Sequence, residues 1–383
     1  MSPSIAAPLR DLLVDLVAID SVNPTLVDGG AGEGGIARHV ARWLAERGFD
    51  VRLQDTGAPE RPNVIGVLRG TGGGRSLMLN GHLDTVGVAG MADPHRPRVE
   101  DGRLHGRGAM DMKGGVAAML DAAARAAQDP PRGDVIVTAV VDGEYASIGT
   151  EAALRECWAE AAIVTEPTGL ELTLWHKGFV WIAVETTGVA AHGSRPQDGR
   201  DAISKMGPVL VGVDGLAREL AAGPGHAVLG TGSVHASLIE GGQELSSYPA
   251  SCRLALERRT IPGEDATTAL GEIEAIIERA RARDAALDAR PRVSFERKPL
   301  DQGKDADIVV ALADALREVT GRDPSFAHSP AWMDAALIAE AGIPVAVFGP
   351  AGEGAHGEIE WVDLASVQRC SDAILGAIRR FCG

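Results

Sequence analysis

The sequence of 383 residues contains few cysteines and no long apolar run. Its four cysteines are widely spaced, so neither a zinc ribbon nor a disulfide framework is expected, and reduced thiols are the simplest account. A transmembrane helix needs about 18 or more apolar residues in a row, and none is seen. The N-terminus also lacks the basic segment and long apolar stretch of a signal peptide. We therefore expect a cytoplasmic protein without a membrane partner. The cysteines are Cys157, Cys252, Cys370 and Cys382.

Positive charge is also scarce, because 37 Lys and Arg residues stand against 53 Asp and Glu residues, for a formal net charge of −16. This excess of negative charge argues against nucleic acid or an anionic membrane as a partner. It is compatible with a bound divalent cation, because carboxylates are the hard oxygen ligands that such an ion needs. The chain is too long for one compact core, so two domains are expected.

The first part of the chain alternates between helical and strand patterns. Helical periodicity occurs at 5–19, 33–47 and 114–127. The run 134–141 is almost continuously apolar, as expected for a strand that is covered on both faces. This alternation predicts an α/β domain with a mostly parallel sheet and helices on both faces. Strands are expected at 63–69, 76–81, 134–141 and 161–165.

The pattern changes after residue 178. Residues 179–298 read as strand, helix, two strands, helix and strand, which is the order of a ferredoxin-like α+β unit. From residue 305 the α/β pattern returns and ends in a helix expected at 363–381. We therefore expect one discontinuous catalytic domain, formed by residues 1–177 and 300–383, with a smaller domain inserted at 178–299.

A metal-site pattern, Gly81-His82-Leu83-Asp84, follows the apolar run that ends at residue 80. The imidazole of His82 could bind a metal through one nitrogen while Asp84 holds the other, which would fix the ring orientation. A strand-terminal histidine is more often a hydrogen-bonded structural residue. However, four further segments place a metal-capable side chain at a strand end or in a Gly-rich turn. These side chains are Asp111, Glu144, Glu166 and His356.

Two histidines and three carboxylates form this set of candidate ligands. Nitrogen and oxygen donors without thiolate suit zinc, with cobalt or manganese as alternatives. Five donors do not fit one tetrahedral metal ion easily, because such an ion takes four ligands. They suit two metal ions that share a bridging carboxylate. Singly, each residue has an ordinary explanation, such as a helix cap for Glu166, a turn for Asp111 or a surface loop for His356. The occurrence of all five in one α/β domain favours the metal site.

The sequence resembles the dinuclear zinc amidohydrolases and peptidases, a family that includes acetylornithine deacetylase, succinyl-diaminopimelate desuccinylase and carboxypeptidase G. The resemblance covers essentially the whole chain. It implies that His82 and Glu166 complete one metal position, that Glu144 and His356 complete the other, and that Asp111 bridges them, often with a cis peptide after it. Asp84 would then support His82. The motifs that carry the resemblance are Gly-His-Leu-Asp-Thr-Val, Gly-Arg-Gly-Ala-Met-Asp-Met-Lys-Gly-Gly, Glu-Pro-Thr, Ala-His-Gly-Ser-x-Pro and Arg-Arg-Thr-Ile-Pro-Gly-Glu.

The resemblance also implies a role for the inserted domain, which in the family mediates homodimer formation. His192 would reach into the active site of the partner subunit and stabilise the oxyanion of the reaction there. The ordinary alternative is a loop histidine that caps the following turn. Arg259 matches a position that receives the substrate's carboxylate, for which a guanidinium fork is suited, although a surface arginine at a strand edge would look the same. Ser246 stands where many relatives carry an Asn that contacts the substrate, which leaves the substrate open.

One departure from the family pattern concerns catalysis. At 142–144 the family reads Asp-Glu-Glu, in which the first Glu is the general base and the second binds metal, whereas this chain reads Asp142-Gly143-Glu144. A positioned base typically contributes about 10²- to 10⁴-fold in rate. The glycine fits an inactivated form of an ordinary hydrolase, a natural homolog that is slow or uses another base, or a homolog that no longer hydrolyses. Since position 143 is not a ligand, Gly143→Glu is expected to restore the base without changing the metal content.

The leading hypothesis is a deacylase with two zinc ions per chain that hydrolyses the amide bond of an N-acyl amino acid or similar small amide and is impaired by Gly143. An exopeptidase acting on short peptides is the alternative within the same chemistry, because only the substrate pocket would distinguish the two. A non-hydrolytic homolog that binds or forms amides is the alternative of a different class, and Gly143 is the feature that favours it.

Overall fold

The computed structural model describes residues 5–383, and the chain divides into two compact units. The first unit comprises the chain up to Leu174 together with Gln302–Ala327 and Met333–Gly383, and the inserted unit comprises Trp175–Asp301 and His328–Trp332. These junctions lie near the predicted 177/178 and 299/300. The packing of 328–332 with the insertion is not evident from the sequence. Within the described residues, no helix is long and apolar enough to cross a membrane.

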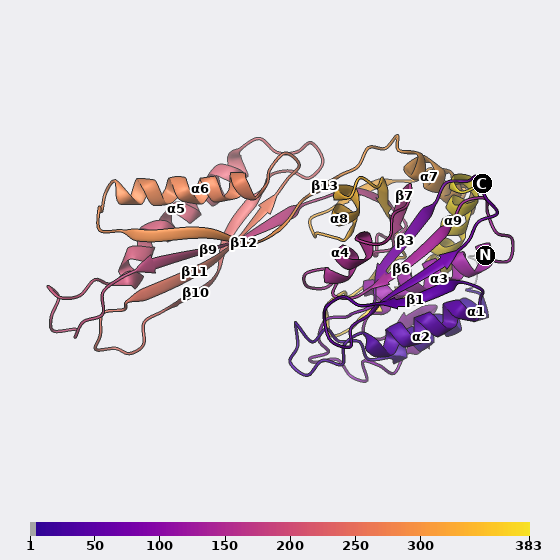
Figure 1. The fold of residues 1–383 in the computed structure, drawn as a ribbon, viewed down its shortest axis with the longest axis horizontal. Coiled ribbons are helices and arrows are strands. Elements are labelled where there is room, and N and C mark those ends of the chain that lie inside the picture. Colours follow the sequence, from indigo (N-terminus) through magenta and orange to yellow (C-terminus); the bar gives the residue numbers. More distant parts are fainter. Residues whose placement is uncertain (1–4) are drawn as a thin grey trace. The chain divides into compact units, whose positions relative to one another are not determined.

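Most of a nine-stranded mixed sheet lies in the first unit (Figure 1), while its short strand β13 (Leu300–Asp301) falls within the residues of the inserted unit. Its strands are β1 (Asp50–Gln54), β2 (Asn63–Leu68), β3 (Leu77–His82), β6 (Val135–Val140), β7 (Ala161–Val164), β8 (Leu172–His176), β13 (Leu300–Asp301), β14 (Phe326–Ser329) and β15 (Val345–Val347). They are arranged in the order β1-β2-β6-β3-β7-β15-β8-β13, with β14 beside β8. The central strands β6, β3, β7 and β15 are parallel, and the pairs that flank them are antiparallel. The α/β class is therefore confirmed, with the parallel pairing confined to the middle of the sheet.

Helices cover both faces of this sheet, as predicted. They are α1 (Ala7–Ala18), α2 (Gly34–Ala45), α3 (Gly114–Ala126), α4 (Ile148–Leu154), α7 (Asp307–Thr320), α8 (Ala335–Glu340) and α9 (Leu364–Phe381). Every residue of β3 and β6 is buried, as the apolar run of 134–141 led us to expect. Gly81 faces Val116 of α3, whereas its neighbour Asn80 donates a hydrogen bond to Thr150 of α4. Because successive strand residues point to opposite faces, α3 and α4 lie on opposite sides.

A small antiparallel sheet in the first unit was not predicted, because each of its strands has only two or three residues. Its strands, in spatial order, are β16 (Gly352–Glu353), β17 (Trp361–Asp363), β5 (Arg103–His105) and β4 (Arg98–Glu100). A short turn, η1 (Ala109–Lys113), whose backbone is non-helical at Asp111 and Met112, follows β5, and the loop 354–360 joins β16 to β17. Pairing of β5 with β17 therefore brings the segments that carry Asp111 and His356 together.

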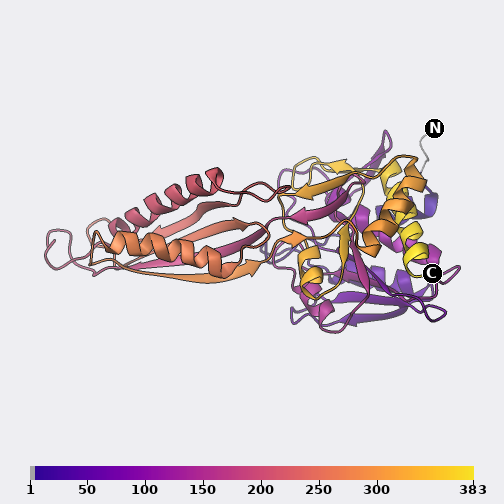
Figure 2. The same ribbon diagram turned by 90° about the horizontal axis from the view of Figure 1, so that it is seen from above.

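The inserted unit has the predicted β-α-β-β-α-β order. Its elements are β9 (Gly178–Thr187), α5 (Ala202–Ala222), β10 (Ser233–Gly241), β11 (Ser251–Thr260), α6 (Ala266–Arg281) and β12 (Asp288–Arg297). The strands form an antiparallel sheet in the order β10-β11-β9-β12, and α5 and α6 cover one of its faces (Figure 2). Alternate strand residues and the inner faces of both helices form one apolar core. Its members include Val180, Ile182, Val184, Leu254, Leu256, Met206, Val209, Ile273 and Ile277.

Candidate metal centre

Three of the candidate ligands follow neighbouring parallel strands of the large sheet. His82 is the last residue of β3, and Glu144 and Glu166 come shortly after β6 and β7. In parallel strands the carboxyl ends meet at one edge of the sheet, which is where such folds place their binding sites. The strand order β6-β3-β7 therefore puts these side chains side by side at that edge.

Asp111 connects the two histidines of the cluster. Its Oδ1 lies 3.4 Å from Nε2 of His82, and its Oδ2 lies 3.3 Å from Nε2 of His356. The His82 nitrogen is also 3.6 Å from Glu166 Oε1, and the His356 nitrogen is 3.1 Å from Glu144 Oε2. Two groups of donors result, each with its ligand atoms within 4.8 Å of one another, and Asp111 belongs to both. All five candidate ligands predicted from the sequence are thus brought together. The peptide bond between Asp111 and Met112 is cis.

The chemistry of this cluster fits two divalent cations. Oδ1 of Asp111 and Oε1 of Glu144 are buried and find no hydrogen-bond donor among residues 5–383. A buried carboxylate oxygen without a donor is costly unless a cation is opposite it. Three carboxylates in one buried site also repel one another. Two positive ions between the histidines and carboxylates would satisfy these oxygens and offset that repulsion.

The pKa values of the candidate ligands reflect the same lack of positive charge in the site. Burial raises the pKa of Glu166 well above its usual value, and burial together with Asp111 raises the pKa of Glu144 to about 7. Burial alone would lower the pKa of His82, but Glu166 and Asp111 raise it well above its usual value. Hydrogen bonds to Asp111 and Glu144 raise the pKa of His356 to about 10. Metal ligands must lose such protons, so cations and protons would compete for this cluster.

Asp84 supports both His82 and the turn that follows β6. Nδ1 of His82 lies 3.1 Å from the backbone oxygen of Asp84 and 3.4 Å from its Oδ1. The Asp84 carboxylate also accepts hydrogen bonds from the backbone N–H groups of Gly143 and Glu144, at 2.8 and 3.1 Å. The predicted position of Asp84 beside His82 is therefore seen, and the same carboxylate fixes the turn that carries Glu144.

Gly143 packs directly against the imidazole of His82. A Cβ atom built on Gly143 would lie 2.6 Å from Cδ2 of His82 and closer still to its Cβ and Cγ, nearer than non-bonded carbon atoms approach. The place of a side chain at 143 is thus taken by the ring of a candidate ligand. This packing changes the expectation that a glutamate at 143 would leave metal binding untouched, because either the turn or His82 must move to admit it.

The sequence of this chain matches the peptidase family M20/M25/M40 over residues 78–380. The chain belongs to this family. It is 30% identical to an acetylornithine deacetylase from Myxococcus xanthus, over 100% of both chains. It is 29% identical to an N-formyl-4-amino-5-aminomethyl-2-methylpyrimidine deformylase from Bacillus subtilis, covering 91% of this chain and 89% of that protein. A succinyl-diaminopimelate desuccinylase from Cereibacter sphaeroides is 30% identical, with coverages of 93% and 94%.

Solved structures share the M20 fold at low sequence identity. An M20 metallo-carboxypeptidase, Sso-CP2 from Sulfolobus solfataricus, aligns with a TM-score of 0.79 at 16% identity, over 98% of this chain and 99% of that chain. The aminopeptidase PepT from Bacillus cereus aligns with a TM-score of 0.77 at 19% identity, over 99% and 100%. These likenesses establish the two-unit fold and leave the substrate open.

Three other residues singled out in the sequence lie in the inserted unit of this M20 chain. His192 and Ser246 are exposed on two adjacent loops, which are joined by a 2.6 Å hydrogen bond from Gly193 N to Ser246 O. Nδ1 of His192 lies 2.8 Å from Oγ of Ser194, in line with the turn-capping alternative. Arg259, on β11, pairs with Glu257 at 2.7 Å. The structure therefore brings His192 and Ser246 together, and it places Arg259 beside Glu257 on β11, an inner strand of the sheet.

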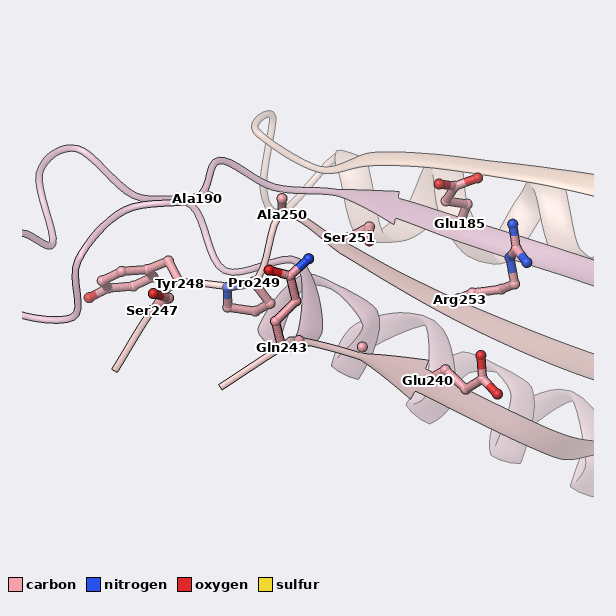
Figure 3. A pocket seen from close by; sticks show the side chains of 12 residues that line it. Glu185, Ala190, Glu240, Gln243, Ser247, Tyr248, Pro249, Ala250, Ser251 and Arg253 are labelled. Carbon is pink, nitrogen blue, oxygen red and sulfur yellow. The ribbon is translucent and has the colours of Figure 1, made fainter. Parts of the chain in front are cut away.

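A cavity of about 390 Å³ opens beside the two loops of the inserted unit (Figure 3). Ser247 and Tyr248 line it from one loop, and Glu185 and Arg253 line it from β9 and β11. Neither His192 nor Ser246 is among its lining residues, and none of the five metal-capable residues is. This cavity therefore includes none of the site residues predicted from the sequence.

Buried ion pairs hold the segments that carry the candidate ligands, and the sequence did not single them out. Arg61 pairs with Glu33 at 2.7 Å and with Asp142 at 3.0 Å, and Arg107 pairs with Glu360 at 2.7 Å. The partners are 28, 81 and 253 positions apart in the chain. Arg107 and Asp142 fall within family motifs, whereas neither periodicity nor spacing marks Glu33, Arg61 or Glu360.

Proposed function

We propose that this M20 chain is a metal-dependent hydrolase that cleaves the amide bond of an N-acyl amino acid or a similar small amide. The observation that carries the proposal is Asp111, whose two oxygens each face a different histidine in a group of metal-capable donors. The relatives of this chain are named for the removal of acetyl, formyl and succinyl groups, which supports a small acyl group as the part that is removed. The donors suit two zinc ions, with cobalt or manganese as alternatives.

Two bound ions would polarise the amide carbonyl and lower the pKa of water in the site. The chain must then carry a proton to the departing amine, and Gly143 has no side chain for this task. Asp142 is a poor substitute, because its Oδ1 accepts hydrogen bonds from Arg61 and Asn23 and its Oδ2 accepts one from Ala146 N. We therefore infer that hydrolysis by this form is slow.

The test of this function is a substrate panel with controlled metal loading. The purified chain, reconstituted with Zn²⁺, is assayed for amine release from a series of N-acyl amino acids and from short peptides. We expect slow release from an N-acyl amino acid that stops when a chelator removes the metal. Faster release from peptides would make the chain an exopeptidase. Tight binding of metal with no turnover of any amide would favour the non-hydrolytic function and contradict this proposal.

We further propose that the chain acts as a homodimer through the inserted unit. Strand β10 is at one edge of the sheet, and Leu238 and Ile239 on it are exposed. Helix α5, which packs beside β10, exposes Ile203 and Val211. An exposed apolar edge strand is a ready template for pairing with another chain, and a second copy offers the same edge. In such a dimer the partner subunit's His192 would add an imidazole to the site.

Leu238→Lys is expected to convert the dimer to a monomer, because a charge on an edge strand opposes pairing. Sedimentation of the protein at micromolar concentration measures the change. Amide hydrolysis should fall with it, because each site would lose the imidazole from its partner. Val99→Lys is the matched control, since Val99 is an exposed residue on β4, an edge strand of the small sheet in the first unit. A parent protein that is monomeric at this concentration would contradict the proposal.

A further inference from the structure

The loop that carries His356 has a single buried anchor. Of the described residues 351–360, Glu360 is the only one that is buried, and the side chain of His356 itself is more than half exposed. By contrast, His82 and Glu166 stand at the ends of buried strands of the large sheet. One metal position thus has a rigid frame, whereas the other depends on how this exposed loop is held.

The carboxylate of Glu360 holds the backbone of the segment that carries Asp111. Its Oε1 accepts hydrogen bonds from the N–H groups of Met110 and Asp111, at 2.9 and 3.0 Å. Its Oε2 accepts from Gly108 N at 2.9 Å and from Nη1 of Arg107 at 2.7 Å. Four donors therefore converge on one carboxylate whose side chain is 1% exposed. Without it, three backbone N–H groups of this turn would lose their partner.

Arg107 extends these contacts to the other two segments of the cluster. Its Nη2 donates to the backbone oxygen of Gly357, directly after His356, at 2.9 Å. Its Nε donates at 3.1 Å to the oxygen of Gly87, which follows the His82 segment. The Arg107 side chain is charged and only 2% exposed, so these are part-buried, charge-assisted bonds of the stronger kind. One ion pair thus ties together the three segments that carry Asp111, His356 and His82.

We infer that Glu360 and Arg107 form a positioning pair that sets the distance between Asp111 and His356, and with it the metal affinity of the Asp111, Glu144 and His356 group. This inference rests on the proposed two-metal function. Neither residue is a member of either donor group, so the pair acts through the backbone of the ligands. Loss of a group that orients a metal ligand typically lowers affinity by about 10- to 100-fold.

Glu360→Gln tests the pair with little change in shape. Gln keeps an oxygen for Met110 and Asp111, but its NH₂ group would face the donors of Gly108 and Arg107. Zn²⁺ is titrated calorimetrically into the metal-free full chain, and the binding step that His356→Ala removes identifies the His356 position. In Glu360→Gln we expect that step to weaken by about 10- to 100-fold while the other step stays close to the parent. Arg107→Lys, which loses the bond to Gly357, should behave likewise.

The matched control is Glu358→Gln, the same chemical change at an exposed position of the same loop. It should bind both ions as the parent does. Two outcomes would overturn this inference and leave the proposed function standing. One is that Glu360→Gln binds Zn²⁺ as the parent does. The other is that both binding steps weaken equally and the metal-free protein melts at a lower temperature. If Glu360→Gln does not fold, Arg107→Lys decides by the same criterion. A parent that binds no Zn²⁺ would overturn the proposed function and this inference with it.

Discussion

Asp111→Asn is expected to abolish tight binding of both metal ions and, with it, amide hydrolysis. Each oxygen of Asp111 faces a different histidine, so a single residue takes part in both groups of donors. An amide keeps the size of the carboxylate but removes its charge and offers an NH₂ group where one oxygen stood. The metal affinity should therefore fall by more than the factor of about 10 to 100 that follows from removing a group that only supports a ligand. His82→Ala should remove one ion and leave the other.

Metal analysis after dialysis against low free Zn²⁺ measures this effect, and amine release from an N-acyl amino acid follows it. Asp121→Asn is a matched control, because the Asp121 side chain is 16% exposed against 17% for Asp111 and lies outside both donor groups. It should retain two ions per chain. Retention of two ions by Asp111→Asn would end the two-metal interpretation.

The framework of the site could be predicted because it follows from strand order. His82, Glu144 and Glu166 stand at the ends of apolar runs, and runs that alternate with helices form parallel strands whose ends meet. The inserted β-α-β-β-α-β unit is predictable for a similar reason, since its order of elements follows from the periodicity of the sequence. Both features depend on local pattern, and a single sequence records local pattern well.

What could not be predicted depends on contacts between distant segments. Glu360 reads as an ordinary charged residue before a short strand, yet it is buried against Arg107, 253 positions away. The flanking strands β1, β8 and β13 pair in antiparallel fashion, and the small sheet has strands too short to show any periodicity. Buried ion pairs of this kind are costly to break, because one charge would be left without its partner. They leave no mark in composition or spacing.

The crowding at Gly143 belongs to the same class of unpredicted features, and it decides how a restored base must be tested. The sequence shows only that the expected glutamate is absent. In the structure, the imidazole of His82 occupies the space next to the glycine, and the backbone N–H of Gly143 donates a hydrogen bond to Asp84. A glutamate at 143 would therefore act on metal binding as well as on proton transfer, and the two effects must be separated.

Gly143→Ala and Gly143→Glu separate them, because both add a Cβ and only the second adds a carboxylate. Both should weaken Zn²⁺ binding, by about 10-fold or more, since the turn or the ring of His82 must shift. At saturating Zn²⁺, Gly143→Glu should hydrolyse an N-acyl amino acid at least about 10²-fold faster than Gly143→Ala, because a carboxylate can then carry the proton to the departing amine. The comparison uses initial rates of amine release at matched metal content. If the two variants turn over equally slowly, a carboxylate at 143 is not the missing base, and the non-hydrolytic function gains support. If Gly143→Ala binds Zn²⁺ as tightly as the parent, the crowding seen at His82 has no energetic consequence, and the slow hydrolysis proposed here would rest on the absent carboxylate alone.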